Sequence, residues 1–147
     1  TLIPYARACG VRLGIEPLHP MYAAERSVIT TLSEALDLVE RFDTPQVGVV
    51  IDTFHVWWDP YVFAQIARAK GHILAYHVCD WLAPMPHMLL GRGMMGDGKI
   101  DFRPLRAAVE AADYTGAIEV EIFNQAIWDT PGDAVLAQLG ERFLQIV

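Results

Sequence analysis

Four short apolar runs alternate with segments of helical spacing, and this alternation limits the possible fold more than any other feature of the sequence. The runs are residues 11–17, 47–52, 73–78 and 117–122. From Val47 to Ile51 the residues are almost all β-branched, which is typical of a strand covered on both faces in a parallel sheet. Strands that alternate with helices predict a parallel α/β fold.

The segments between the strands carry helix signals. Helices are predicted at 1–9, 31–42, 59–70, 102–112 and 133–146. In the second of these, apolar residues at 32, 35, 36 and 39 would line one face. Gly10 and Gly71 are suited to helix ends, and Asp101 is predicted to cap the helix that follows it. The order is one helix followed by four strand–helix units.

The glycine pattern favours a barrel over a nucleotide-binding sheet. No Gly-x-Gly-x-x-Gly follows the first strand, and no Walker-type Gly-Lys-Ser/Thr occurs in the sequence. A closed (β/α)8 barrel needs eight units and typically about 250 residues, whereas this chain has four units in 147 residues. We therefore predict a single partial barrel domain over 1–147, whose remaining units lie elsewhere or come from a partner.

Charge and hydropathy exclude several classes of partner. The net charge of −7 argues against nucleic acid and anionic membranes, which attract lysine and arginine clusters. No apolar run approaches the roughly 20 residues that span a bilayer, and the first residues lack the features of a secretory signal, so we expect a cytoplasmic protein. Cys9 and Cys79 are too few for a disulfide framework and are predicted to be reduced.

Ligand-type side chains recur at one place in each unit, at or near the carboxyl end of the strand. They are Glu16, Asp52, His77 and Glu121. In parallel barrels these ends form the active-site face. Three carboxylates and one imidazole suit Mn²⁺, Mg²⁺, Co²⁺ or Zn²⁺, and three such negative charges would repel one another without a cation.

Four segments in order resemble a known family. They are Gly14-Ile15-Glu16-Pro17-Leu18, Val50-Ile51-Asp52-Thr53-Phe54-His55, Tyr76-His77-Val78-Cys79-Asp80 and Gly116-Ala117-Ile118-Glu119-Val120-Glu121-Ile122. The chain resembles the xylose isomerase-like TIM barrels, which include sugar-phosphate isomerases and epimerases, ketose 3-epimerases, inosose dehydratases and endonuclease-four enzymes. The resemblance implies the C-terminal half of the barrel, with strands 5–8 and helices 4–8.

The resemblance also implies a site. Glu16, Asp52, His77 and Glu121 match the metal ligands of the family, and Glu16 and Glu121 would act as the catalytic acid and base. Glu119 has the same strand parity as Glu121 and is the alternative ligand. His55 matches the histidine of the family's Asp-x-x-His element, so the chain must turn after Asp52 to bring both to one site.

Further residues are candidates for binding the substrate. Arg92 falls where relatives contact substrate oxygens, and His19 and Trp57 follow strand ends. Asp80 is a candidate to orient His77 or to hold an arginine. Endonuclease-four enzymes place an Asp-x-His metal pair where this chain has Leu90 and Arg92, which argues against DNA cleavage.

The implied activity is a divalent-metal-dependent isomerisation or epimerisation of a sugar, sugar phosphate or keto-polyol. It would proceed by α-proton abstraction through an enediolate. Two alternatives remain open: an inosose dehydratase-type lyase on the same site, and a catalytically silent half-barrel. In each case the chain would need the N-terminal half-barrel or a second copy, because four strands leave two edges unpaired.

Overall fold

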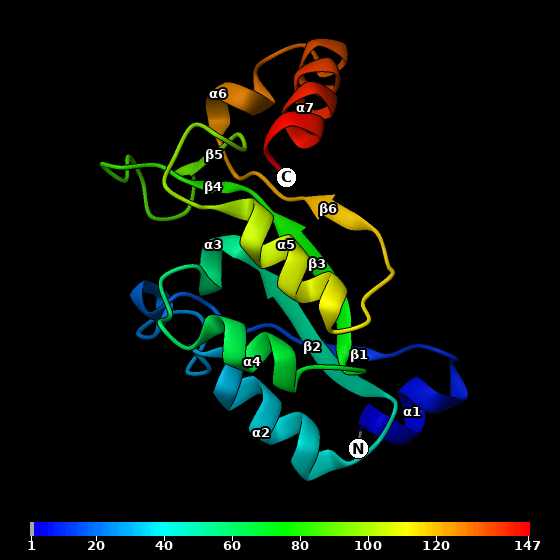
Figure 1. The fold of residues 1–147 in the computed structure, drawn as a ribbon. Helices are drawn as coiled ribbons and strands as arrows, with labels where there is room; N and C mark the ends of the chain where they lie inside the picture. Colours follow the sequence, from blue (N-terminus) through cyan, green and yellow to red (C-terminus); the bar gives the residue numbers. More distant parts are fainter. Residues whose placement is uncertain (1) are drawn as a thin grey trace.

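Four parallel strands form one sheet in this computed structural model, which describes residues 2–147. They are β1 (Leu13–Ile15), β2 (Val47–Asp52), β3 (Ile73–Val78) and β6 (Ile118–Val120), hydrogen-bonded in the order β1-β2-β3-β6. Each strand lies beside the strand of the preceding unit, and β1 and β6 form the edges (Figure 1). The predicted parallel α/β fold is confirmed, and its strand order is that of four consecutive strands of a barrel.

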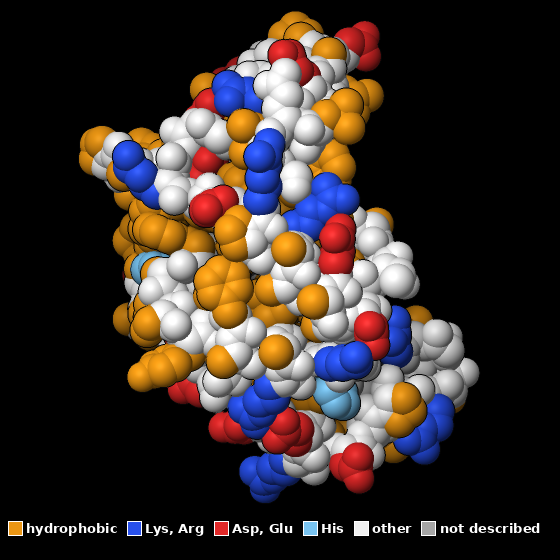
Figure 2. All heavy atoms as spheres, in the orientation of Figure 1, with side chains coloured by type: hydrophobic (Ala, Val, Ile, Leu, Met, Phe, Trp, Pro, Cys, Tyr) orange, Lys and Arg blue, Asp and Glu red, His pale blue; other side chains and the backbone are white. Residues whose placement is uncertain are grey.

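Helices cover one face of this sheet. The longer helices among the described residues are α1 (Leu2–Ala8), α2 (Leu32–Phe42), α4 (Val62–Arg68), α5 (Phe102–Ala111) and α7 (Gly132–Ile146), of which α2, α4 and α5 form this cover. In Figure 1, α2, α4 and α5 lie side by side in front of the strands, and α2 contacts β2 directly. The surface over these helices carries acidic and basic side chains scattered among apolar ones (Figure 2). In the part of the chain that is described, no helix combines the length and apolar character needed to cross a bilayer.

The start of α2 shows why the sequence folds this way locally. The Thr31 hydroxyl accepts a hydrogen bond from the Glu34 N–H at 3.2 Å, and the Glu34 carboxylate accepts from the Thr31 N–H at 3.0 Å. This reciprocal capping satisfies two backbone donors at the helix start. The predicted apolar face of α2 is fully buried against the sheet, as the spacing of residues 32, 35, 36 and 39 requires.

The two faces of the sheet differ in burial. Side chains that face the helices, such as Ile51 and Tyr76, have no exposed surface. On the opposite face Val50 and Leu74 are half-buried, and Glu119 is exposed. The half-buried face is the one that a closed barrel would turn inward.

The sequence patterns missed the short elements. These are the 3₁₀ turn η1 (Pro20–Tyr22), α3 (Thr53–Val56), the antiparallel pair β4 (Asp80–Trp81) and β5 (Arg92–Gly93), and α6 (Gln125–Trp128). Elements of two to four residues contain too few positions for a periodic signal. The helix predicted from 59 begins at Val62. Asp101 occupies the N-cap position of α5, as predicted, but its side chain makes no capping hydrogen bond.

A buried carboxylate holds the loop that follows β5. Asp80 has no exposed surface, and its oxygens accept hydrogen bonds from four backbone N–H groups at 2.8–3.0 Å, those of Trp81, Gly96, Gly98 and Ile100. Gly98 has to be glycine here, because a Cβ would collide with the Trp81 carbonyl and the Asp80 carboxylate. Asp80 therefore fixes a loop and orients neither His77 nor an arginine, contrary to the expectation from sequence.

Candidate metal centre and active site

The four predicted ligands meet at the carboxyl ends of the strands. Glu16 directly follows β1, Asp52 ends β2, His77 lies near the end of β3, and Glu121 directly follows β6. One ligand atom from each residue lies within 4.8 Å of the others. Register explains the convergence, since Asp52 pairs with His77 and the Glu121 N–H donates to the Val78 carbonyl at 3.2 Å. Residues up to 105 positions apart thus form one cluster.

Two ligand atoms of this cluster, one on His77 and one on Glu16, lack protein partners. His77 Nδ1 lies 3.8 Å from Glu16 Oε1 and 3.7 Å from Glu121 Oε2, too far for a hydrogen bond. Among the residues described, both His77 Nδ1 and Glu16 Oε1 are buried without any hydrogen-bond partner. Buried polar atoms left unpaired are costly, and two that face the same small volume fit a cation between them. The donor set therefore fits a divalent metal ion.

Arg92 provides positive charge at the edge of the cluster. Its Nη1 lies 2.6 Å from Asp52 Oδ2 and 3.0 Å from Glu121 Oε2, and the side chain is 6% exposed. The ring of Phe54 stacks under the guanidinium at 4.7 Å and that of Phe123 at 4.8 Å. The sequence predicted a loop arginine near the substrate, and the structure places it against two of the predicted ligands.

Burial and mutual repulsion change the acidity of the cluster. Desolvation, with repulsion from Asp52 and Glu121, raises the pKa of Glu16 to about 7. Desolvation raises the pKa of Asp52 to about 6, although the Arg92 guanidinium and the Phe54 N–H favour its ionised form. Carboxyls whose pKa values are raised by burial and by neighbouring charges are typical of functional sites.

His55 stands beside the cluster as a neutral imidazole. The chain turns into α3 immediately after Asp52, which brings His55 Nε2 to 3.8 Å from Asp52 Oδ2, as the Asp-x-x-His spacing requires. Desolvation and the nearby Arg92 lower the pKa of His55 to about 3. Its Nδ1 accepts a hydrogen bond from the His19 N–H at 3.0 Å, and Arg92 Nη2 lies 3.1 Å from its Nε2. A neutral imidazole accepts at only one nitrogen, so these two contacts compete.

A cavity of about 170 Å³ opens onto the cluster. It is lined by Glu16, Leu18, Tyr22, Arg26, His55, Leu89, Arg92, Glu121 and Phe123. Of the predicted substrate contacts, His55 and Arg92 line it, whereas His19 and Trp57 do not. His19 instead packs on Trp81 with ring centres 4.5 Å apart, and Trp57 packs on the same ring at 5.5 Å.

Several of the lining residues were not predicted from sequence. Phe123 follows Glu121 by two positions, so the parity that selects Glu121 also selects Phe123. Arg26 and Leu89 come from loops, where no periodic signal indicates direction. Glu119 is exposed and outside the cluster, whereas the Glu121 carboxylate is part of it.

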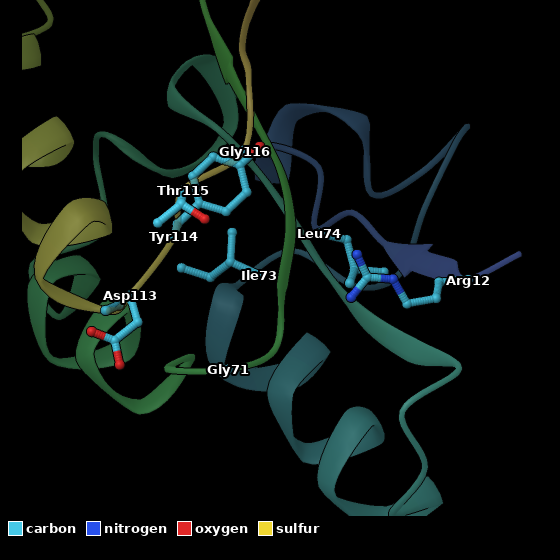
Figure 3. Close-up of a pocket in the computed structure, with 9 residues that line it drawn as sticks. Arg12, Gly71, Ile73, Leu74, Asp113, Tyr114, Thr115 and Gly116 are labelled. Carbon is cyan, nitrogen blue, oxygen red and sulfur yellow. The ribbon is translucent and has the colours of Figure 1, made fainter.

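A second hollow lies at the opposite end of the strands. Figure 3 shows Arg12, which precedes β1, on the same side of β3 as Leu74, while Ile73 points to the other side toward Tyr114. Gly71 and Gly116, which precede β3 and β6, complete the rim of this cavity of about 280 Å³. It is remote from the ligand cluster, and in parallel barrels this end serves stability.

Fold and site together define a class, a section of a (β/α)8 barrel with a carboxylate and imidazole cluster at the carboxyl ends of its strands. The family described as "Xylose isomerase-like TIM barrel" matches residues 1–144. The chain belongs to this family.

Curated relatives have names from two kinds of enzyme. A probable ketose 3-epimerase of Synechocystis sp. is 25% identical over 92% of this chain and 47% of its own length. A 3-dehydroshikimate dehydratase of Pseudomonas putida is 29% identical over 83% of this chain and 19% of its own length. The chain therefore spans less than half the length of these relatives.

Solved structures share the fold. Protein SMc04130 from Sinorhizobium meliloti 1021 is 53% identical, with a TM-score of 0.95 over 99% of this chain and 54% of that one. The IOLI protein, whose structure holds a zinc atom, is 20% identical, with a TM-score of 0.83 over 98% of this chain and 51% of that one. In both, the similarity covers about half of the solved chain.

The raised pKa of Glu16 predicts a pH dependence. Glu16 has a pKa of about 7 in the folded protein, above its ordinary 4.5. Between these two pH values the folded protein therefore keeps a proton that the unfolded chain has already released. Without a cation, the free energy of unfolding should therefore fall as pH rises from 5 to 7, while Mn²⁺ affinity should rise by about tenfold or more from pH 5.5 to 7.5. Calorimetric titration measures the affinity. An affinity independent of pH would contradict the assignment.

Proposed function

We propose that the protein containing this chain is a divalent-metal-dependent isomerase or epimerase of hydroxy-carbonyl compounds such as ketoses. The proposal rests above all on one observation, that the Glu16 and Glu121 carboxylates belong to the same cluster around His77. Membership in the family and the similarity to a probable ketose 3-epimerase support it. The activity requires the remaining strands of the barrel, since the described residues line only part of a closed site.

In this proposal Glu16, Asp52, His77 and Glu121 hold the ion, which would supply positive charge to the carbonyl and hydroxyl oxygens of the substrate. Glu16 removes the α-proton, since an ionised carboxylate beside the substrate can accept it. Glu121, on the strand at the other edge of the sheet, returns a proton to the opposite face. Reprotonation at the same carbon gives the epimer, and at the neighbouring carbon the isomer.

Arg92 and His55 would act on the substrate oxygens. The guanidinium touches the cluster and lines the cavity, so it can stabilise the negative charge of an enediolate. If the His19 N–H keeps its bond to His55 Nδ1, the imidazole hydrogen sits on Nε2 and can be donated to a hydroxyl or carbonyl oxygen. A substrate oxygen placed between them would relieve the competition at His55.

The test is solvent exchange at the α-carbon. The protein at full natural length is incubated with Mn²⁺ and D-fructose, and with further ketoses, in D₂O, and the products are followed by NMR. We expect deuterium at the carbon next to the carbonyl together with the epimeric or isomeric ketose. Absence of exchange from every hydroxy-carbonyl compound tried, with the metal bound, would contradict the proposal.

The similarity to a 3-dehydroshikimate dehydratase supports a second candidate, a lyase. Proton removal by the same carboxylate would then be followed by loss of the β-hydroxyl as water. The two candidates differ in product, since a lyase gives an unsaturated carbonyl compound with ultraviolet absorbance and an epimerase does not.

A further inference from the structure

Arg26 lines the cavity that opens onto the ligand cluster, yet it belongs to neither the cluster nor its ion pairs. Four other arginines form ion pairs with carboxylates, namely Arg68, Arg92, Arg106 and Arg142. Among the described residues Arg26 forms none, and its side chain donates no hydrogen bond to another residue. An exposed guanidinium at a cavity wall is thus available to a ligand.

The position of Arg26 is set by Tyr22. The Arg26 N–H donates to the Tyr22 carbonyl at 2.9 Å, and the guanidinium carbon lies 5.5 Å from the centre of the tyrosine ring. Tyr22 is buried, and its hydroxyl donates to the Met88 carbonyl. The edge of the same ring meets His55, with centres 5.7 Å apart. Arg26, Tyr22 and His55 therefore form a continuous wall that leads from the surface to the cluster.

Two cavities meet at this wall. The one at the cluster shares Tyr22, Arg26 and Leu89 with a neighbouring cavity of about 560 Å³ that also contacts Glu25 and His87. A ligand that reached the cluster at one end would therefore pass Arg26 toward the outer cavity. Arg92 is already paired with two carboxylates of the cluster, whereas Arg26 forms no ion pair with a described residue, so an anionic group of the ligand would be attracted to Arg26.

We propose that Arg26 binds an anionic group of the substrate, so that the compound processed at the cluster is a phosphorylated or carboxylated hydroxy-carbonyl compound. This inference rests on the proposed function, because it adds a specificity contact to the same site. The guanidinium would form charge-assisted, two-pronged hydrogen bonds to phosphate or carboxylate oxygens.

Binding measurements on the metal-loaded protein at full natural length test the inference without requiring turnover. The probes are D-fructose, D-fructose 6-phosphate and 3-dehydroshikimate, with inorganic phosphate alone as a further arm. We expect at least one anionic probe to bind about tenfold more tightly than D-fructose. The probe that binds more tightly, D-fructose 6-phosphate or 3-dehydroshikimate, identifies whether the preferred anionic group is a phosphate or a carboxylate.

Variants of Arg26 test whether this residue is responsible for the higher affinity of the anionic probe. Arg26→Ala should lower the affinity for the anionic probe about tenfold and change the affinity for D-fructose less than twofold. Arg26→Lys keeps the positive charge and should show a smaller loss of affinity for the anionic probe. Arg41→Ala is the matched control, an exposed arginine at the end of α2 that touches no cavity of the site, and it should change nothing.

Two results would overturn the inference: equal affinity for neutral and anionic probes, or equal losses for both in Arg26→Ala. These results are distinct from failure of the proposed function. A protein that exchanges the α-proton of neutral ketoses with no preference for anions refutes the role of Arg26 alone. One that binds an anionic probe through Arg26 but exchanges no proton refutes the proposed function alone.

Discussion

Replacing Glu121 with glutamine should weaken Mn²⁺ binding by about 100-fold or more and abolish turnover. Loss of an outer-shell partner of a metal ligand already costs about 10–100-fold in affinity or activity. Glu121→Gln would remove a charged oxygen 3.7 Å from His77 Nδ1 and the carboxylate that Arg92 contacts at 3.0 Å. Glutamine has nearly the same shape as glutamate, so a loss of metal binding would be due to the lost negative charge and not to altered packing.

Glu119→Gln is the control for this experiment. Glu119 lies on β6, two residues before Glu121, yet it is exposed and outside the cluster. We expect this variant to retain stoichiometric metal by elemental analysis and turnover within twofold of the parent. Metal retention in Glu121→Gln together with metal loss in Glu119→Gln would show that Glu119, and not Glu121, is the ligand.

Asp80→Ala should lower the free energy of unfolding by about 3–5 kcal/mol, the largest stability effect we expect from any single change. The substitution leaves four backbone N–H groups without their acceptor, and each buried donor left unpaired costs about 1–3 kcal/mol, part of which relaxation and water recover. Chemical denaturation of the full-length protein measures the effect.

The matched control for Asp80 is Asp97→Ala in the same loop. Asp97 is 42% exposed and pairs with Arg142 at 2.8 Å, and exposed pairs of this kind contribute at most about 1 kcal/mol. A loss of similar size in both variants would mean that Asp80 contributes no more than a surface charge.

The sequence predicts the framework of this fold well because the framework depends on local patterns. The β-branched run of β2 and the apolar spacing of α2 each indicate their element without knowledge of the rest. The positions of Glu16, Asp52, His77 and Glu121 follow from topology, since equivalent ends of parallel strands must meet at one edge. Residue type and place in the strand indicate these four, with Glu119 left as the alternative to Glu121.

Contacts that depend on loop conformation could not be predicted in the same way. Arg92 pairs with Asp52 across 40 residues because β5 pairs with β4, a ribbon too short to leave a periodic signal. Asp80 has the same residue type as Asp52, but its partners are backbone N–H groups, which exist in every residue and leave no trace in the sequence. His19 also lies in a loop, and its ring packs on Trp81 instead of lining the cavity at the cluster.

The strand order has a consequence for how the chain assembles. Because each strand pairs with the strand of the preceding unit, β2 can add to β1, β3 to β2 and β6 to β3 as synthesis proceeds, without waiting for distant segments. The last strand to dock carries Glu121 at its end. Nascent chains that stop short of β6 would therefore possess three of the four converging ligands, and the centre would be completed only when β6 docks, before α6 and α7 are added.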